Sequence, residues 1–255
     1  MKNRPDENIA VMYHKLSKDR SMGGQVFIPQ DPDFWPESWK KVEYKTYNSI
    51  LNVSLLPQKD CNIDMSLSSV LGQRRSSRNF KERGHSLTLR EISVLLANSV
   101  AITGGFDEER DLKENGRMYP SGGGVYPIEV YVLVNRSMEL RRGIYHYSFL
   151  KHSLEFIAEI SNDIVGRVFY YKWAQSCAGA IFLTSVFYRN FEKYGERGYR
   201  YVLFEAGHIA QNLYLSSGAL ELAVCAVGGV DDESIEDMIG LDGEHESVVY
   251  TIALG

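Results

Sequence analysis

Three arginines and two serines fall within five consecutive residues of an otherwise acidic chain, at Arg74-Arg75-Ser76-Ser77-Arg78. A guanidinium group offers a planar fork of donors that matches phosphate, and serine hydroxyls can bind the remaining oxygens at short range. Five basic residues and one acidic residue lie between positions 73 and 83, whereas the whole chain has a formal charge of −5. The cluster predicts a local site for a multiply charged anion, with a solvated basic surface as the alternative.

A second group, YPSGGGVYP, lies at positions 119–127. It precedes residues 128–134, in which Ile128, Val130, Val132 and Val134 alternate with other residues in the two-residue repeat of a strand. Glycine permits positive φ and close backbone approach, and proline fixes the chain on either side. We therefore expect a rigid loop that presents its backbone to a ligand, with a ligand-free connection as the alternative. The order of loop and then strand differs from the dinucleotide-binding fingerprint, and no GK[ST] phosphate-binding loop occurs in the sequence.

Glu205 and His208 form an E-x-x-H pair. A carboxylate-bridged metal site needs two such pairs and further glutamates, and the sequence offers one. We therefore predict no metal site and interpret His208 as an ordinary helix histidine.

The elements that must position these groups become regular from Thr88, which forms a capping-box pattern with Glu91. Apolar spacing and turn residues then predict a hairpin, buried strands and helices. The expected helices are 66–71, 88–100, 158–174, 199–222 and 231–240, and the expected strands are 128–134, 143–147, 153–157, 180–186, 223–227 and 248–254. This order indicates an α+β fold with a mixed central sheet surrounded by helices.

Composition limits the function further. With 255 residues, 44% hydrophobic and 24% charged, the chain is long enough for one large core. A pI near 5.7 argues against general nucleic-acid binding, and no apolar segment is long enough to span a membrane. Three cysteines and an N-terminus without a signal-peptide pattern predict a cytoplasmic protein. Residues 1–60, rich in proline and aromatic residues, are expected to form an irregular extension that packs on the 61–255 domain or on a partner.

The order of several motifs resembles one known family. These motifs are RRSSRxF, YPSGGGxYP, GIYHY, KYGERGYRY, EAGHIAQNL and VGGVDD, and YHxxSK near the N-terminus is also similar. The series resembles the nitroreductase-fold, FMN-dependent dehydrogenases of the SagB type, which oxidise azoline rings in ribosomally made peptides. The resemblance runs from about Tyr13 to Gly255 and is loose over the first 60 residues.

The resemblance implies a homodimer with a nitroreductase-like fold and FMN at the subunit interface. It implies that the flavin is held by three groups of residues. These are Arg74, Arg75, Ser76 and Arg78 at the phosphate, Pro120, Ser121, Gly122 and Gly123 along the isoalloxazine, and Gly228 or Gly229 near flavin N5. Many nitroreductases have a further basic residue near the C-terminus, whereas the ending YTIALG has none.

The resemblance also implies that Lys193 and Tyr194 lie beside the flavin as the catalytic pair. Aromatisation of an azoline removes an acidic α proton and delivers a β hydride to the flavin, so a base must face the flavin across the ring. Free tyrosine and lysine have pKa values of about 10 and 10.4, so burial and neighbouring groups must adjust one of them. We predict that Tyr194 takes the proton and Lys193 assists, with exchanged roles, or an exposed polar loop without a role, as alternatives.

The expected function is oxidation of thiazoline or oxazoline rings to thiazole or oxazole in a peptide, with dioxygen as the final acceptor. A cyclodehydratase that makes the azolines is the expected partner. Two alternatives stay open from the residues: an NAD(P)H-dependent nitroreductase or flavin reductase on the same fold, and a flavoprotein that serves as a non-catalytic scaffold.

Overall fold

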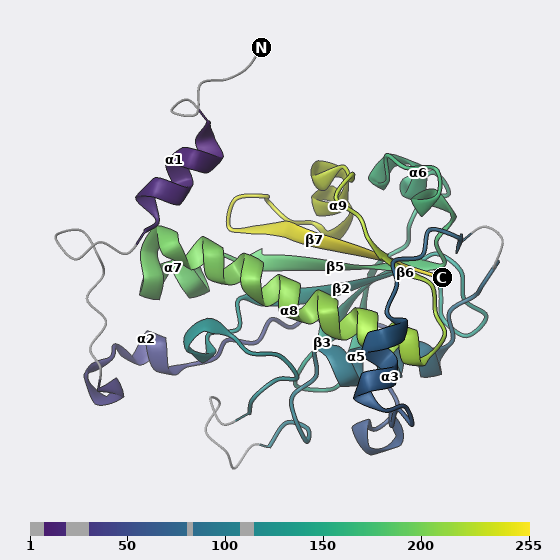
Figure 1. Cartoon of the computed structure of the whole chain (residues 1–255), viewed down its shortest axis with the longest axis horizontal. Coiled ribbons are helices and arrows are strands. Elements are labelled where there is room, and N and C mark those ends of the chain that lie inside the picture. Colours follow the sequence, from purple (N-terminus) through teal and green to yellow (C-terminus); the bar gives the residue numbers. More distant parts are fainter. Residues whose placement is uncertain (1–7, 19–30, 81–83, 108–114) are drawn as a thin grey trace.

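The computed structural model describes residues 8–18, 31–80, 84–107 and 115–255. Seven strands form one sheet in the order β1-β4-β3-β2-β5-β7-β6 (Figure 1). The strands are β1 (Asn52–Ser54), β2 (Ile128–Val134), β3 (Gly143–Ser148), β4 (Ser153–Ala158), β5 (Gly179–Val186), β6 (Val224–Ala226) and β7 (Glu246–Leu254). Neighbouring strands pair antiparallel throughout, so the prediction of an α+β fold is confirmed but that of a mixed sheet is wrong. Tight connections such as the turn between β3 and β4 require the antiparallel direction.

Helices cover both faces of the sheet. They are α1 (Ile9–Leu16), α2 (Glu37–Lys40), α3 (Leu67–Gln73), α5 (Leu89–Ser99), α6 (Ile164–Val168), α7 (Tyr188–Tyr194), α8 (Gly198–Ala219) and α9 (Asp232–Ile239). Side chains of β2 alternate between two cores. Val130 and Val132 pack with α5 and α8, whereas Tyr131 and Leu133 pack with α6 and α9. Because both faces are covered, every residue of β2 is buried.

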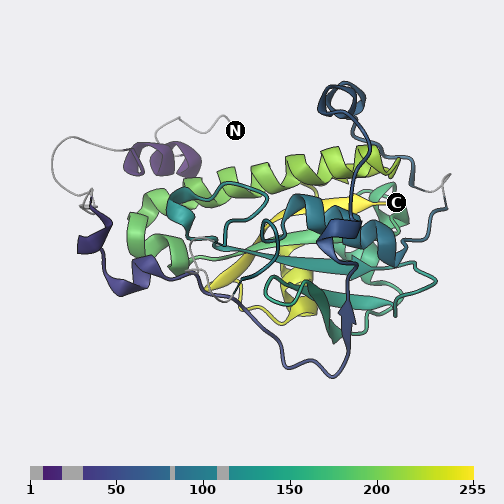
Figure 2. The same ribbon diagram turned by 90° about the horizontal axis from the view of Figure 1, so that it is seen from below.

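The long helix α8 runs along one side of the sheet, with α1 and α3 on its outer side (Figures 1 and 2). Tyr13 of α1 packs edge-on against Tyr199 at the start of α8, and Arg200 donates to the Ser17 hydroxyl at 2.8 Å. No described helix is both long and apolar enough to cross a bilayer.

Several local predictions are confirmed. Thr88 and Glu91 form the capping box of α5, and Gly240 ends α9 in the left-handed conformation. The helix predicted over 158–174 is wrong, because β4 extends through Ala158 and only α6 is α-helical in the remainder. Phe169 leaves the helix to form a bridge with Val230, which ends the helical run after one turn.

Candidate active site

The basic cluster lies against the C-terminal part of α8 and against β6. The Ser76 hydroxyl is 3.0 Å from that of Tyr214, and the Arg74 guanidinium lies 5.5 Å from the Tyr214 ring. The same tyrosine hydroxyl accepts a hydrogen bond from the Ala226 amide at 2.8 Å. Since β6 leads directly into Gly228 and Gly229, the structure brings Arg74, Ser76 and this glycine turn together from distant parts of the sequence.

Two aromatic rings, those of Trp173 and Tyr171, lie between Arg78 and the glycine turn. The Arg78 guanidinium lies 5.5 Å from the Trp173 ring, which stacks on Tyr171 at 5.7 Å. A Cβ atom at Gly229 would lie only 2.4 Å from the Tyr171 ring, so a larger residue at this position would displace Tyr171. Arg75 instead folds back and donates to the carbonyls of Gly72 and Arg74, at 3.2 and 2.8 Å. Arg74 and Arg78 are therefore better placed than Arg75 to hold an anion.

The glycine-rich loop meets Lys193 and Tyr194 at the other end of α8. Gly123 has φ 66°, and a Cβ atom there would lie 2.1 Å from the Tyr194 hydroxyl and 2.9 Å from the Lys193 ammonium. Gly122 faces Tyr201 of α8, and a Cβ atom at Gly122 would lie 3.4 Å from the Cβ of Tyr201. Pro120 precedes the loop and is exposed. The loop backbone and the Lys193-Tyr194 pair thus lie in contact. A glycine at position 123 leaves room for this contact.

Lys193 is 1% exposed, which excludes the alternative of an exposed polar loop at this residue. Its ammonium lies 3.5 Å from the centre of the Trp35 ring and 5.8 Å from that of Trp39. Burial raises the pKa of Tyr194, whose ring packs edge-on against Tyr201 at 4.9 Å. A neighbouring cation is therefore what this phenol needs to act as a base near neutral pH.

Two buried charged residues lie beneath the loop. The Arg117 guanidinium donates to the Tyr119 hydroxyl at 2.8 Å and lies 3.6 Å from the Phe149 ring. Glu205 is 1% exposed, and burial raises its pKa to about 7 against the opposing effects of the Ser121 hydroxyl and Arg117. Neither residue was singled out for this role by its sequence pattern, because burial and the neighbours across the fold create it.

The E-x-x-H pair does not act together. Glu205 faces the interior, whereas His208 is exposed on the outer side of α8. Among the described residues no group of histidine, cysteine, aspartate and glutamate has metal-binding geometry.

The two groups of predicted site residues lie at opposite ends of α8. Tyr201 contacts the glycine-rich loop and Tyr214 contacts the basic cluster, and thirteen residues of helix span about 20 Å. Guanidinium forks and hydroxyls at one end suit a phosphate dianion, and side-chain-free backbone at the other end suits a flat ring. The residues fit FMN chemically, although within one chain the two groups lie too far apart to surround a single ring system.

The profile of the Nitroreductase family matches residues 71–255, so the chain belongs to this family. Membership points to an oxidoreductase. The MJ1384 protein of Methanocaldococcus jannaschii, whose name assigns it to the nitroreductases, is 32% identical over 178 residues, 69% of this chain and 85% of that protein.

Two further relatives have names from peptide processing, in line with the resemblance stated above. The trifolitoxin-processing protein TfxB of Rhizobium leguminosarum is 28% identical over 65% of this chain and 46% of its own length. The microcin B17-processing protein McbC of Escherichia coli is 29% identical over 64% of this chain and 60% of its own length. The chain thus spans about half of these two relatives. The E. coli McbBCD complex with truncated pro-MccB17 contains a chain of the same fold, with TM-score 0.62 and 24% identity over 90% of this chain and 84% of that one.

Proposed function

We propose that this protein is an FMN-dependent oxidase that converts thiazoline or oxazoline rings of a peptide to thiazole or oxazole. The observation that carries the proposal is the contact of the buried Lys193 and the half-buried Tyr194 with the backbone of Gly123. A lysine and a tyrosine held against a bare backbone can accept a proton from a flat ring bound there. The names of the relatives TfxB and McbC support a peptide as the substrate.

In this proposal Arg74, Ser76 and Arg78 hold the FMN phosphate, with Arg75 in a lesser role. The backbone from Pro120 to Gly123 would bind the flat ring system, and Gly228 or Gly229 would offer a backbone amide to the flavin. Bound FMN would supply the acceptor for the hydride lost from the substrate, and dioxygen would be the final acceptor.

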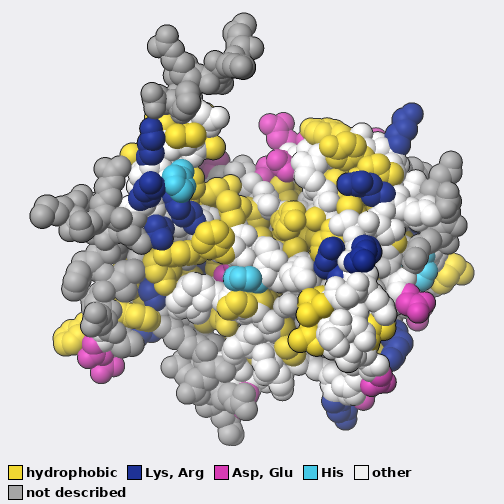
Figure 3. Space-filling model, viewed as in Figure 1, with side chains coloured by type: hydrophobic (Ala, Val, Ile, Leu, Met, Phe, Trp, Pro, Cys, Tyr) yellow, Lys and Arg dark blue, Asp and Glu magenta, His cyan; other side chains and the backbone are white. Residues whose placement is uncertain are grey.

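The separation of the two groups along α8 supports a homodimer in which each flavin contacts both chains. Leu203 and Phe204 on α8, and Leu67 and Leu71 on α3, are 42 to 67% exposed. Figure 3 shows hydrophobic side chains gathered along the face that α8 crosses, with basic side chains to its left and right. A second copy that covered this surface would bury it and bring the basic cluster of one chain towards the glycine-rich loop of the other.

The residues of this chain divide the remaining work. Tyr194 accepts the α proton, and the Lys193 ammonium stabilises the phenolate through charge. Trp35, Trp39 and Tyr201 exclude water from this end of the site. A cyclodehydratase that forms the azolines is the proposed partner, which is consistent with the McbBCD complex of the E. coli relative.

The test uses purified protein and an azoline-containing peptide, with loss of two hydrogens followed by mass spectrometry. We expect Lys193→Met and Tyr194→Phe to keep FMN, seen in the absorbance spectrum, and to lose turnover at least 100-fold. Lys151→Met, a change at an exposed lysine in the turn between β3 and β4, is the control. Unaffected turnover in both site variants would remove this assignment. The pair Arg74→Ala and Arg78→Ala should release flavin, and full FMN occupancy in that double variant would contradict the phosphate site.

One relative favours a second candidate, since MJ1384 is the most extensively covered of the three relatives described. An NAD(P)H-dependent nitroreductase or flavin reductase would oxidise NAD(P)H steadily in the presence of a nitroaromatic or quinone. Absence of this activity, with azoline oxidation retained, would exclude it.

A further inference from the structure

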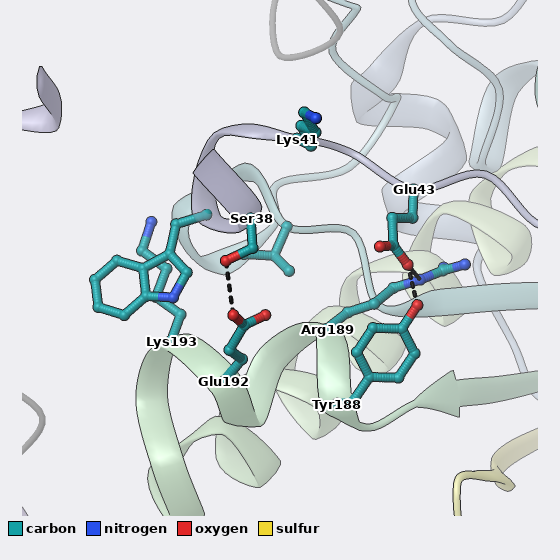
Figure 4. Close-up of a pocket in the computed structure, with 9 residues that line it drawn as sticks. Ser38, Lys41, Glu43, Tyr188, Arg189, Glu192 and Lys193 are labelled. Atoms are coloured by element: carbon teal, nitrogen blue, oxygen red, sulfur yellow. Dashed lines mark hydrogen bonds and ion pairs between the residues drawn. The ribbon is translucent and has the colours of Figure 1, made fainter. Parts of the chain in front are cut away.

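The segment from residue 31 to residue 43, which lies outside the part matched by the family profile, crosses α7 beside Lys193. The Ser38 hydroxyl donates to the Glu192 carboxylate at 2.6 Å, and the Tyr188 hydroxyl donates to Glu43. These contacts attach the segment to the first and the last turn of α7. Figure 4 shows the narrow groove between them, with Ser38 and Glu43 on one side and Tyr188 and Glu192 on the other.

This attachment places two indole rings on the Lys193 ammonium. Trp35 lies over it at 3.5 Å and Trp39 at 5.8 Å, while Gly123 approaches it from the loop. An ammonium that is 1% exposed has lost most of its hydration, and that loss disfavours the charge. An indole face within about 6 Å attracts a cation, most strongly where water is excluded. The two indole rings therefore replace part of the electrostatic stabilisation that water would give the Lys193 ammonium.

We propose that Trp35, supported by Trp39, is a positioning residue that keeps Lys193 charged and fixed beside Gly123 and Tyr194. The N-terminal segment then completes the active site. The inference rests on the proposed function for the role of Lys193, and on the contacts alone for its charge and position.

Other charged and titratable groups surround Lys193, and its ammonium also lies 5.5 Å from the centre of the Tyr194 ring. On α7, Glu192 binds Ser38 and Arg189 binds the buried Glu129 at 2.6 Å. Tyr201 of α8 accepts a hydrogen bond from Arg197 at 2.9 Å. The remaining groups are Tyr194, Tyr188, Lys41 and Glu43, which line the site or the groove.

The experiment compares Trp35→Leu, which keeps an apolar cover without an aromatic face, with Trp35→Phe, which keeps the face. Acylation by acetic anhydride at pH 8 proceeds through the uncharged amine, so its rate at Lys193, read by peptide mass mapping, reports the charge. We expect Lys193 to be acylated about tenfold faster in Trp35→Leu than in the parent protein, and within about threefold of the parent in Trp35→Phe. Lys151 in the same digest is the internal reference, and Phe34→Leu, at an exposed neighbour of Trp35, is the matched control.

The turnover of azoline peptide gives the second measurement. Trp35→Leu should lower kcat about tenfold with KM within about twofold, and Trp35→Phe should restore most of kcat. Equal acylation rates in the Leu and Phe variants would overturn the inference. Because acylation needs no substrate, this outcome is distinct from failure of the parent protein to oxidise azolines, which would overturn the proposed function and leave the acylation result standing.

Discussion

Two clusters of buried charged residues in this protein differ in how well their polar groups are paired. In the sheet cluster, His146 lies 3.0 Å from Glu129 and 3.1 Å from Glu155, and Arg189 donates to Glu129 at 2.6 Å. In the loop cluster, formed by Arg117 and Glu205 beneath the glycine-rich loop, both Glu205 oxygens and two Arg117 nitrogens make no hydrogen bond of normal geometry within the described part of the chain.

The same residue type responds oppositely in the two clusters. Hydrogen bonds and charge from His146 and Arg189 outweigh burial and lower the pKa of Glu129 to about 2. At Glu205 burial prevails and raises the pKa to about 7. The sheet cluster pairs each of its charged side chains with another and connects β2, β3, β4 and α7, which is a structural role. The loop cluster keeps unsatisfied groups and a carboxyl that titrates near neutrality, which is typical of a functional site.

The largest effect is expected from breaking the sheet cluster. Glu129→Ala leaves Arg189 and His146 buried without their common partner, and should cost about 3 to 5 kcal/mol of unfolding free energy in urea titrations. Lys151→Ala, which removes the exposed partner of Glu155, should cost less than about 0.5 kcal/mol. The folded pKa of Glu129 is depressed, so its stabilising effect is present above pH 4.5 and is lost as the pH falls towards 2. Equal unfolding midpoints for Glu129→Ala and the parent would refute the structural role.

Glu205→Gln, in contrast to Glu129→Ala, should raise the unfolding free energy at neutral pH and above. Because the folded pKa is raised, the folded protein keeps a proton between pH 4.5 and about 7 that the unfolded chain releases, so stability falls as the pH rises through this window. The variant should match the parent at pH 5 and exceed its unfolding free energy by up to roughly 3 kcal/mol at pH 8. Urea titrations at the two pH values measure this, and a variant less stable than the parent at pH 8 would show that Glu205 is satisfied after all.

A smaller effect is expected at the loop itself. Gly123 and Gly124 share positive φ values of 66° and 65°, but a Cβ atom meets Tyr194 and Lys193 at the first and open space at the second. Gly124→Ala should cost about 1 kcal/mol of backbone strain, and Gly123→Ala roughly 1 kcal/mol more, with loss of azoline turnover. Thermal unfolding and turnover distinguish the two, and equal effects of both changes would contradict the close contact.

Much of the fold could be predicted from local patterns. The capping box at Thr88, the strand 128–134 and the end of the helix near Gly240 depend on neighbours within a few residues, and all three are as expected. The helix predicted over 158–174 is wrong because Phe169 pairs with Val230, sixty-one positions away, and periodicity does not record such a partner.

The residues of the candidate site also fall into those that the sequence could predict and those that it could not. The glycine-rich loop and the Lys193-Tyr194 pair could be proposed because their residue types and motif order carry a signal, and the structure brings them into contact. Trp35, Tyr214 and Glu205 could not be assigned, since their roles arise from a packed neighbour rather than from spacing in the sequence. Only the assembled fold reveals such residues.

The helix α8 constrains how this protein can change. It connects Tyr201 at the loop with Tyr214 at the basic cluster, and an α-helix turns about 100° with each residue. One inserted or deleted residue between them would rotate one contact away from its site while the other stayed in place. Substitutions on the exposed side of α8 are compatible with both contacts, whereas a change in its length is not, so its residue count is under stronger constraint than most of its side chains.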